Sequence, residues 1–425
     1  MIAWLLISFF VLLFLGVPIA MSLGLSAMGG ILFLGGGSTV TIAQRMFEGM
    51  NSFALLAIPL YTFAGFTMSK GGISKRLMDF CYSIVGHIYG GLAHVNVLSS
   101  MIFAGISGSA VADTAGVSGM FMPEMVRTGY SKNFTVAVTA ISSTIGIIIP
   151  PSIPMVVIAG ICGISTGKLF LGGIIPGVLC GLAQMIVSYF LAKKEGVPKE
   201  PGHFTIGPVL HGLWESWPAL LMPIIIVGTI TMGIVSPTEA GVIAVVYGLF
   251  AGGIIYRELK WEDIKFAFAE TVRTSGRIFI VIGAAKLYTV MLTTAGFDKW
   301  VAKTMLGFST NPTVILIMIL LIFFIVTMFM ESIATLTLFM PILYPIALGV
   351  GINPIVLSVL ITVVIGVGLV TPPVGMCIYV ACDLMDVTVG EVFPTLVPFI
   401  AATFVCIALM VAFPQLILLP TYLMA

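Results

Sequence analysis

The segment AISSTIGIIIPPSIPMVV, residues 140–157, places two consecutive prolines, Pro150 and Pro151, inside a long apolar stretch. Proline has no N–H and its ring clashes with the preceding turn, so a helix breaks there and leaves carbonyl groups unpaired. In a membrane, such a backbone is tolerated only where it is buried in protein or lines a cavity. The segment therefore predicts a discontinuous helix with polar backbone groups at its break.

A second copy of this pattern lies in the other half of the chain. In the first copy, Asp113 and FMP at 121–123 precede the proline pair, and in the second, Glu331 and FMP at 339–341 precede TPPVGM at 371–376. The acidic residues are 331 − 113 = 218 positions apart, and the proline pairs are 372 − 150 = 222 apart. Matching interruptions in two halves of a membrane chain indicate the binding site of a transporter.

The amino-acid composition indicates whether the protein lies in water or in a membrane. Of its 425 residues, 59% are hydrophobic and only 8% are charged, and the mean hydropathy is +1.19. Soluble proteins are about 25% charged, so we expect an integral membrane protein. The net charge of +1 excludes binding to nucleic acid through bulk charge. The sequence has no P-loop, so we do not expect it to use ATP.

Apolar runs of about 20 residues predict ten membrane crossings, five in each half. They lie at 2–17, 18–36, 52–69, 133–164 and 169–192, and at 217–235, 238–256, 275–295, 354–385 and 392–420. The amphipathic joins at 41–51 and 258–273 are expected to lie in the membrane interface, and two more amphipathic segments follow at 73–87 and 297–307.

The segments at 90–127 and 312–349 are too long for one crossing and have small or polar residues in the middle. We predict that each is a re-entrant helical hairpin. Because five crossings per half is an odd number, the second half is expected to be inverted relative to the first. The predicted units are a first repeat at 1–195, a cytoplasmic linker at 196–213 and a second repeat at 214–425, all-α throughout.

Loop charges support this count of crossings. Thirteen of the eighteen Lys and Arg residues fall on one predicted side and four on the other, with Lys286 inside a crossing. Cytoplasmic loops are enriched in these residues, so the crowded side is predicted to be inside and both termini outside.

The first predicted hairpin tip contains Gly105, Ser107, Gly108, Ser109 and Asp113. Hydroxyl and carbonyl oxygens suit a small cation, and glycines let the backbone approach it. Small residues also favour close helix packing, which is the plainer interpretation. Asp113 favours a site, because a carboxylate at membrane depth is costly and usually functional.

The two breaks complete the predicted sites. Carbonyls of Gly146 and Ile149 are expected to coordinate a cation, and the half-helix starting near Ser152 offers its positive N-terminus to an anion. We predict two cation sites, one per hairpin tip, with the substrate between them. The candidate substrate-binding residues are Ser109, Asp113, Ser152, Glu331, Thr335 and Gly375.

Three single residues leave alternatives open. Glu331 is interpreted first as an acceptor for N–H groups at its tip, and otherwise as a proton site or an ion ligand. Lys286 either pairs with a substrate carboxylate or with a buried acid, or it has no functional role. Glu239, in SPTEAG, is interpreted as a first-turn acid favoured by the helix dipole.

The chain resembles the large membrane subunit of tripartite ATP-independent periplasmic (TRAP) transporters, of the DctM or SiaM type. The matching stretches are NSFALLAIPLYTFAG at 51–65, GISGSAVADTAG at 105–116, GYSKNFTVAVTAISSTIGIIIPPSIPMVV at 129–157, SPTEAG at 236–241 and TPPVGM at 371–376. They span essentially the whole chain. SPTEAG departs slightly from the more usual PTEAA of the family.

The resemblance implies a sodium-coupled, elevator-type importer of organic acids in the bacterial inner membrane. It favours sialic acid over C4-dicarboxylates as the substrate. It implies two partners, a small four-helix membrane subunit of the Q type and a periplasmic substrate-binding protein of the P type. It implies Na⁺ as coupling ion, no cofactor and no enzymatic activity. By position, the resemblance places sodium-binding residues at Ser107, Gly146, Ile149, Pro151, Ser332, Gly368, Thr371 and Pro373. Gly108 and Gly366, from the patterns of the hairpin tip and the break, are expected to bind sodium as well. Pro150 and Pro372 are expected to interrupt the two helices.

Other classes of function remain open at this point. A self-sufficient sodium- or proton-coupled carboxylate permease would need no binding protein. An intramembrane enzyme would need paired catalytic groups, and Asp113 and Glu331 are the one candidate pair, on hairpins predicted to enter from opposite sides. A channel would not couple an ion to a substrate.

Overall fold

The computed structural model describes residues 1–34, 38–197 and 205–424, and these residues form helices and turns without a β-strand. The first half contains α1 (Ile2–Phe14), α2 (Ile19–Leu34), α3 (Thr39–Met50), η1 (Phe53–Leu56), α4 (Ala57–Lys70), α5 (Ile73–Val85), α6 (Gly91–Ser107), α7 (Ala110–Arg127), α8 (Lys132–Ser143), η2 (Thr144–Ile147), α9 (Ile153–Cys162) and α10 (Thr166–Glu195). The predicted all-α class is therefore confirmed.

The second half repeats much of this order. It contains α11 (Ile206–Thr231), α12 (Pro237–Phe250), the π turn η3 (Ala251–Ile255), α13 (Trp261–Thr294), α14 (Phe297–Phe308), α15 (Pro312–Thr327), α16 (Ser332–Gly349), α17 (Pro354–Gly368), α18 (Met376–Met385), α19 (Val389–Ala412), α20 (Gln415–Leu418) and η4 (Leu419–Met424). The predicted hairpins are the helix pairs α6–α7 and α15–α16, and the predicted broken helices are α8–α9 and α17–α18.

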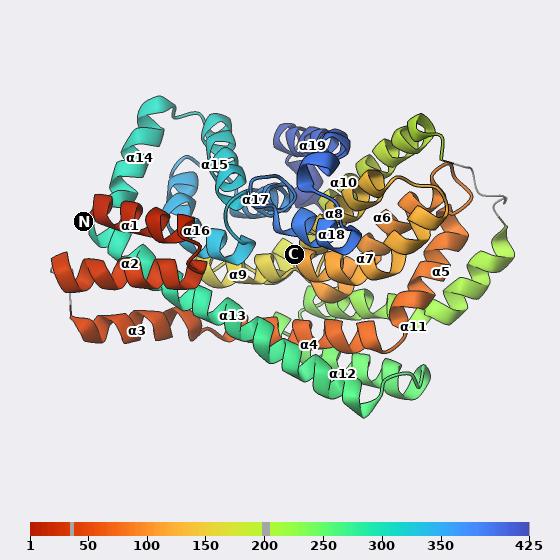
Figure 1. Cartoon of the computed structure of the whole chain (residues 1–425). Helices are drawn as coiled ribbons and strands as arrows, with labels where there is room; N and C mark the ends of the chain where they lie inside the picture. Colours follow the sequence, from red (N-terminus) through yellow and green to blue (C-terminus); the bar gives the residue numbers. More distant parts are fainter. Residues whose placement is uncertain (35–37, 198–204, 425) are drawn as a thin grey trace.

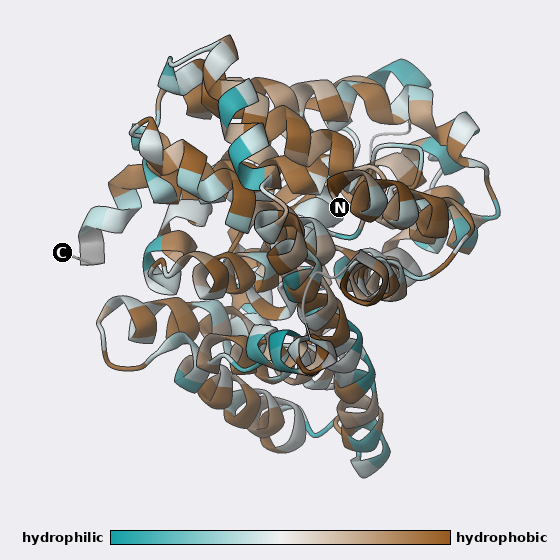
Figure 2. Ribbon diagram, turned by 90° about the vertical axis from the view of Figure 1, so that its left-hand side faces the viewer, coloured by the Kyte–Doolittle hydropathy of each residue, from teal (hydrophilic) through white to brown (hydrophobic). Residues whose placement is uncertain are grey.

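Within the described ranges, seven helices are long and apolar enough to cross a membrane. Six of them lie on predicted crossings, and the seventh is α16, the second arm of a hairpin. Large apolar side chains such as Phe14, Phe33 and Trp214 are about three-quarters exposed, as a lipid-facing surface requires. Figure 2 shows hydrophobic residues along helices throughout the molecule. The chain is therefore a multi-pass membrane protein.

Helix α13 corrects one expectation. Residues 258–273 were predicted to form an interfacial helix separate from the crossing at 275–295, whereas α13 runs unbroken from Trp261 to Thr294. The junction has no proline, and a single glycine, Gly276, costs a helix only about 1 kcal/mol. In Figure 1, α13 runs diagonally across the lower side of the molecule. It packs against α2, α3, α4 and α16.

Two helix ends also differ from the predicted segments. Residues 206–213, predicted as linker, form the first turns of α11, and residues 198–204 of that linker, with Lys199, lie outside the described residues. The last crossing, predicted to reach residue 420, ends at Ala412. Pro414 explains this end, because the residue before a proline is disfavoured in helical conformation.

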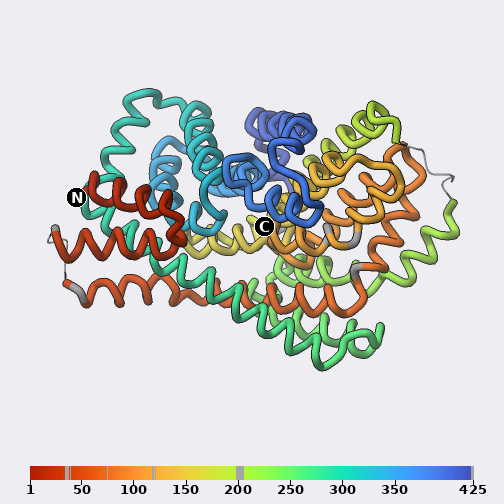
Figure 3. The backbone as a smooth tube through the Cα atoms, in the orientation of Figure 1, coloured from red at the N-terminus to blue at the C-terminus, as the bar shows by residue number. Residues whose placement is uncertain are grey.

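The core has two parts. A smaller apolar cluster joins α1 and α2 to α13 and α16, and the hydroxyl of Tyr288 there donates to the carbonyl of Leu5 at 2.9 Å. The larger cluster unites the hairpins, the broken helices and α10. Figure 3 follows the chain from the N-terminal helices at the left to the C-terminal helices near the centre. The hairpins and breaks are thus packed together in the larger cluster.

Candidate functional site

The first hairpin tip is held by local hydrogen bonds. Helix α6 ends at Ser107, and Gly108 turns the chain with φ +64°. Ser109 then caps α7 by accepting a bond from the N–H of Ala112 at 3.4 Å. The hydroxyl of Ser107 accepts a bond from the N–H of Ser109 at 3.2 Å and donates to Oδ1 of Asp113. The tip therefore fixes the direction of the Asp113 carboxylate.

Asp113 is only 2% exposed, and its second oxygen, Oδ2, has no hydrogen-bond partner in the described structure. This carboxylate lies against Gly146 of the first break, where a Cβ atom would collide with it. A buried carboxylate that is not fully paired carries a large desolvation cost. Oδ2 therefore offers a free oxygen to a cation or a proton.

The first break, which meets this carboxylate at Gly146, contains unpaired carbonyl oxygens. Helix α8 continues into η2, and the N–H groups of Ile148 and Ile149 both donate to Ile145. No hydrogen bond of the described residues ends on the carbonyl of Gly146 or Ile149. Unwound carbonyls combined with a carboxylate make an oxygen-only donor set, the kind that coordinates sodium in discontinuous transporter helices.

Each hairpin tip is hydrogen-bonded to the chain just beyond its proline pair. In the first half, Ile153 donates its N–H to the carbonyl of Gly108 at 3.2 Å, and in the second half Val374 donates to Met328 at 3.0 Å. Both Pro-Pro bonds, at 150–151 and 372–373, are cis. The same tip-to-break contact thus recurs in the two halves.

The second tip uses its acidic residue differently. Glu331 is the N-cap of α16, and its Oε2 accepts from the N–H groups of Ile333 at 2.9 Å and Ala334 at 3.3 Å. Its Oε1 accepts from the hydroxyl of Ser332 at 2.7 Å. These bonds agree with the preferred interpretation of Glu331 from the sequence, an acceptor for N–H groups at the hairpin tip. Both carboxylate oxygens take part in them.

The second break is more open than the first. Pro373 and Val374 are exposed, whereas Pro150 and Pro151 are buried. The carbonyls of Gly366 and Thr371 receive no hydrogen bond from a described residue. The predicted sodium ligands of this half thus include free carbonyls, but without a carboxylate oxygen left unpaired.

The remaining predicted residues of this half support the local packing. Gly368 lies against the second hairpin, since a Cβ atom there would be 2.7 Å from Cβ of Thr327. Gly375 is the N-cap of α18 and has φ +44°.

The two breaks lie back to back. A Cβ atom on Gly366 would lie 3.2 Å from Cβ of Thr144, in η2. Most predicted site residues are therefore gathered in one central region. The hydroxyls of Ser152 and Thr335 are used locally, because they donate to the carbonyls of Ile147 at 2.5 Å and Glu331 at 3.1 Å. Their predicted role in substrate binding stays a prediction.

A buried polar network behind the first break was not predicted. Asn96 donates to Thr139 at 2.7 Å and accepts from Ser142 at 3.0 Å, and Ser100 donates to Ser142 at 3.1 Å. These bonds tie hairpin helix α6 to α8. The partners are more than 40 positions apart in sequence, so no spacing rule could have paired them.

Glu239 lies in the first turn of α12, as predicted, and it also caps the helix, which was not predicted. The carboxylate of Glu239 accepts from the N–H of Ser236 at 2.7 Å, and the Ser236 hydroxyl accepts from the N–H of Glu239 at 3.3 Å. This reciprocal pair is a capping box. SPTEAG is therefore a helix start.

Comparison with curated proteins gives long matches at moderate identity. The chain is 37% identical to an isethionate TRAP transporter permease protein DctMQ of Oleidesulfovibrio alaskensis, over 92% of this chain and 62% of that protein. It is 35% identical to the sialic acid TRAP transporter large permease protein SiaM of Vibrio cholerae, over 96% and 95%. It is 35% identical to the C4-dicarboxylate TRAP transporter large permease protein DctM of Pseudomonas aeruginosa, over 95% and 94%.

A solved structure supports the fold alone. The crystal structure of the Alcanivorax borkumensis YdaH transporter matches 89% of this chain and 88% of its own, with a TM-score of 0.59 and 13% sequence identity. The family model described as the tripartite ATP-independent periplasmic transporter, DctM component, matches residues 6–416. The chain belongs to this DctM family.

Proposed function

We propose that this chain is the translocating subunit of a sodium-coupled importer of an organic acid in the bacterial inner membrane. In this proposal, a periplasmic binding protein delivers the acid and a small four-helix membrane subunit completes the transporter. Sodium binds at the hairpin tips and breaks, and the acid moves inward with it. The hairpins and broken helices move together as an elevator.

One observation carries the sodium part of the proposal. The unpaired Oδ2 of Asp113 lies against Gly146, and the carbonyls of Gly146 and Ile149 in the same break accept no hydrogen bond from a described residue. Neutral oxygens and one carboxylate suit a monovalent cation, which brings a single charge to offset. Among the described residues no cluster of three or more His, Cys, Asp or Glu is present.

The substrate proposal rests on the chemistry that the relatives share. The names of three relatives specify isethionate, sialic acid and C4-dicarboxylates, and all three are organic anions. Identities of 35–37% do not separate these substrates. We therefore propose an organic anion, with sialic acid as the first compound to test.

The decisive experiment is uptake of labelled acid into proteoliposomes that contain this chain and the small membrane subunit. The binding protein is added outside with an inward sodium gradient, and each component is omitted in turn. The proposal expects uptake that needs all components and the gradient. Uptake by this chain alone would instead establish a self-sufficient permease. Absence of uptake for all three classes of acid would overturn the proposal.

A further inference from the structure

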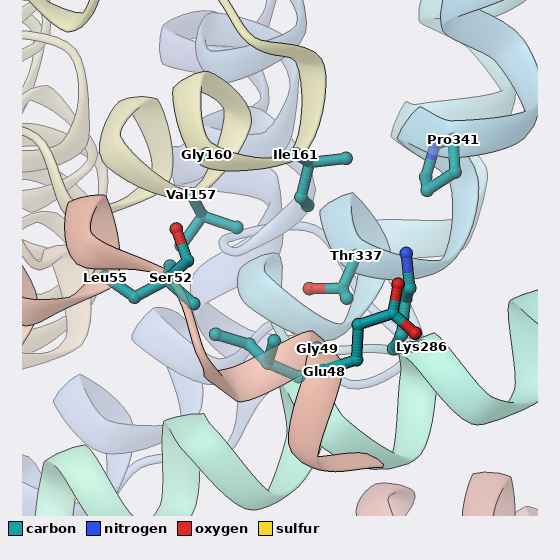
Figure 4. Close-up of a pocket in the computed structure, with 11 residues that line it drawn as sticks. Glu48, Gly49, Ser52, Leu55, Val157, Gly160, Ile161, Lys286, Thr337 and Pro341 are labelled. Carbon is teal, nitrogen blue, oxygen red and sulfur yellow. The ribbon is translucent and has the colours of Figure 1, made fainter. Parts of the chain in front are cut away.

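A cavity of about 180 Å³ lies apart from the hairpin tips. Its walls come from the end of α3 and the following turn, from α9, from α13 and from α16 (Figure 4). Glu48 and Lys286 are the charged side chains among its lining residues, and Ser52 and Thr337 contribute hydroxyls. The cavity thus lies where the long helix α13 meets one broken helix and one hairpin.

Close packing fixes the position of Lys286. A Cβ atom on Gly49 would lie 2.6 Å from Cβ of Lys286, so only glycine allows α3 to approach α13 here. On the opposite helix, a Cβ atom on Gly283 would lie 3.2 Å from the carbonyl of Met46. The two glycines let α3 and α13 pack closely, the start of the Lys286 side chain lies against Gly49, and Lys286 lines the cavity.

The charges of Arg45, Glu48 and Lys286, at and beside the cavity, do not cancel. Glu48 forms an ion pair with Arg45 at 2.7 Å. The hydrogen bond from Arg45 lowers the pKa of Glu48 most, and the positive charge of Lys286 lowers it further. Lys286 itself has no ion pair within 4 Å and no hydrogen bond in the described structure. Two positive groups and one negative group leave a net charge of +1. A lysine inside a predicted crossing is costly without a partner, so the cavity favours an anion.

We infer that Lys286 binds the acid group, carboxylate or sulfonate, of the transported organic anion in this cavity. Ser52 and Thr337 lie within the same walls and offer hydroxyls to the remainder of the molecule. In this arrangement α3 and α13 hold the acid group. The other two walls connect to the proposed sodium sites, because α9 follows the first break and α16 follows the second hairpin tip. The inference rests on the proposed function and adds to it a second contact site for the substrate.

The test measures binding separately from transport. The complex of this chain with the small membrane subunit is purified, and its melting temperature is followed while the transported acid is titrated at saturating sodium. Lys286→Gln is expected to raise the midpoint concentration of the acid roughly ten- to hundredfold, as expected for a lost charged hydrogen bond. The sodium midpoint, titrated without acid, is expected to stay unchanged.

Three further variants make the result specific. Lys286→Arg keeps the charge and is expected to stay within about threefold of the wild-type acid midpoint. Glu48→Gln removes the competing carboxylate and is expected to lower the acid midpoint, the opposite sign. Lys303→Gln changes an exposed lysine on α14 and serves as the matched control. An uncharged amide of the acid is expected to bind wild type and Lys286→Gln equally.

The failures of the two proposals are distinguishable. An acid midpoint that Lys286→Gln leaves unchanged, in a complex that still transports the acid, overturns the subsite and leaves the proposed function standing. Loss of co-purified anionic phospholipid in Lys286→Gln, with the acid midpoint unchanged, assigns the cavity to a lipid headgroup and also overturns the subsite. A wild-type complex that neither transports nor binds any of the acids overturns both.

Discussion

The carboxylate of Asp113, on a hairpin, lies against the α carbon of Gly146, in the broken helix beside it. Their sequence separation is 33 positions, and the space for the carboxylate exists only because residue 146 has no side chain. Oδ2 of Asp113 is buried there without a described partner. The contact joins the two features that the sequence repeats, an acidic tip and a Pro-Pro break.

Gly146→Ala tests this contact directly. The added methyl group would collide with the carboxylate and displace it from the break. We expect the sodium concentration for half-maximal uptake to rise at least about tenfold, or about 1.4 kcal/mol. The measurement is uptake in proteoliposomes as a function of external sodium.

Gly116→Ala is the matched control, because a Cβ atom there meets nothing within 4 Å and the residue lies on the same hairpin as Asp113. Its sodium activation should equal that of the wild type. Equal activation in Gly146→Ala as well would remove this contact from the sodium site.

Ser107→Ala removes the hydroxyl that donates to Asp113. Without this bond the carboxylate loses its described partner and its fixed direction, so we expect weaker sodium activation of uptake. Ser100→Ala is the control on the same helix, since its hydroxyl bonds to Ser142 instead. It should lower the melting temperature without changing sodium activation. Identical sodium curves for Ser107→Ala and wild type would exclude Ser107 from the site.

Gly108→Ala probes the contact between the first tip and its break. Gly108 has φ +64°, and a Cβ atom would lie 2.5 Å from the carbonyl oxygen of Pro151 and 3.3 Å from the nitrogen of Ile153. We expect a destabilisation larger than the roughly 1–2 kcal/mol of a left-handed alanine alone. The readout is the melting temperature of the purified complex, together with uptake.

Gly163→Ala separates the two costs. Gly163 has nearly the same φ, +67°, but a Cβ atom there meets nothing within 4 Å. It should therefore show the backbone cost only. If Gly108→Ala and Gly163→Ala have the same melting temperature, the close contact between the first hairpin tip and its break is contradicted.

The hairpins and breaks could be predicted from sequence because their signals are local. Two consecutive prolines remove two neighbouring N–H groups and interrupt a helix, whereas a single proline such as Pro176 lies inside the continuous helix α10. Ser236 with Glu239 forms a capping box within four residues. The tip at Ser107 and Gly108 was also recognisable, because a polar and glycine-containing turn interrupts an apolar segment. Such features need no knowledge of the neighbouring helices.

The contacts that convert these features into a site were not predictable. The bond from Val374 to Met328 and the packing of Gly366 against Thr144 depend on how distant helices are packed. Lys286 was visible as an unusual charge, but its position beside Gly49 follows from the crossing of α3 and α13. The continuity of α13 was missed because a change from amphipathic to apolar sequence does not by itself end a helix.

Changing Pro150 and Pro151 together to alanine should restore helical hydrogen bonding across the first break. Alanine supplies the two missing N–H groups, which can then pair with carbonyls of the preceding turn. We expect uptake to be abolished while the protein still inserts and is expressed, because the free carbonyls at the proposed sodium site are lost. Uptake and membrane expression are measured in parallel. Normal uptake in this double variant contradicts the role assigned to the break.

Glu331→Gln distinguishes a structural role from a substrate-binding role. The Glu331 carboxylate accepts two N–H groups of its own helix and the Ser332 hydroxyl, so both oxygens are already used. Loss of an N-cap costs about 1 kcal/mol in typical helices, and glutamine keeps one acceptor oxygen. We therefore expect a melting temperature lowered by a few degrees, with the acid concentration for half-maximal uptake unchanged.

Asp113→Asn provides the contrast for this last variant, because both changes neutralise one acidic residue of a hairpin. In Asp113 the affected oxygen Oδ2 has no described partner, so neutralisation should abolish sodium activation while helix capping remains intact. The pair predicts opposite phenotypes, a stability defect for Glu331→Gln and a coupling defect for Asp113→Asn. A coupling defect in Glu331→Gln at an unchanged melting temperature would show that its carboxylate serves the ion or the substrate, and that capping is secondary.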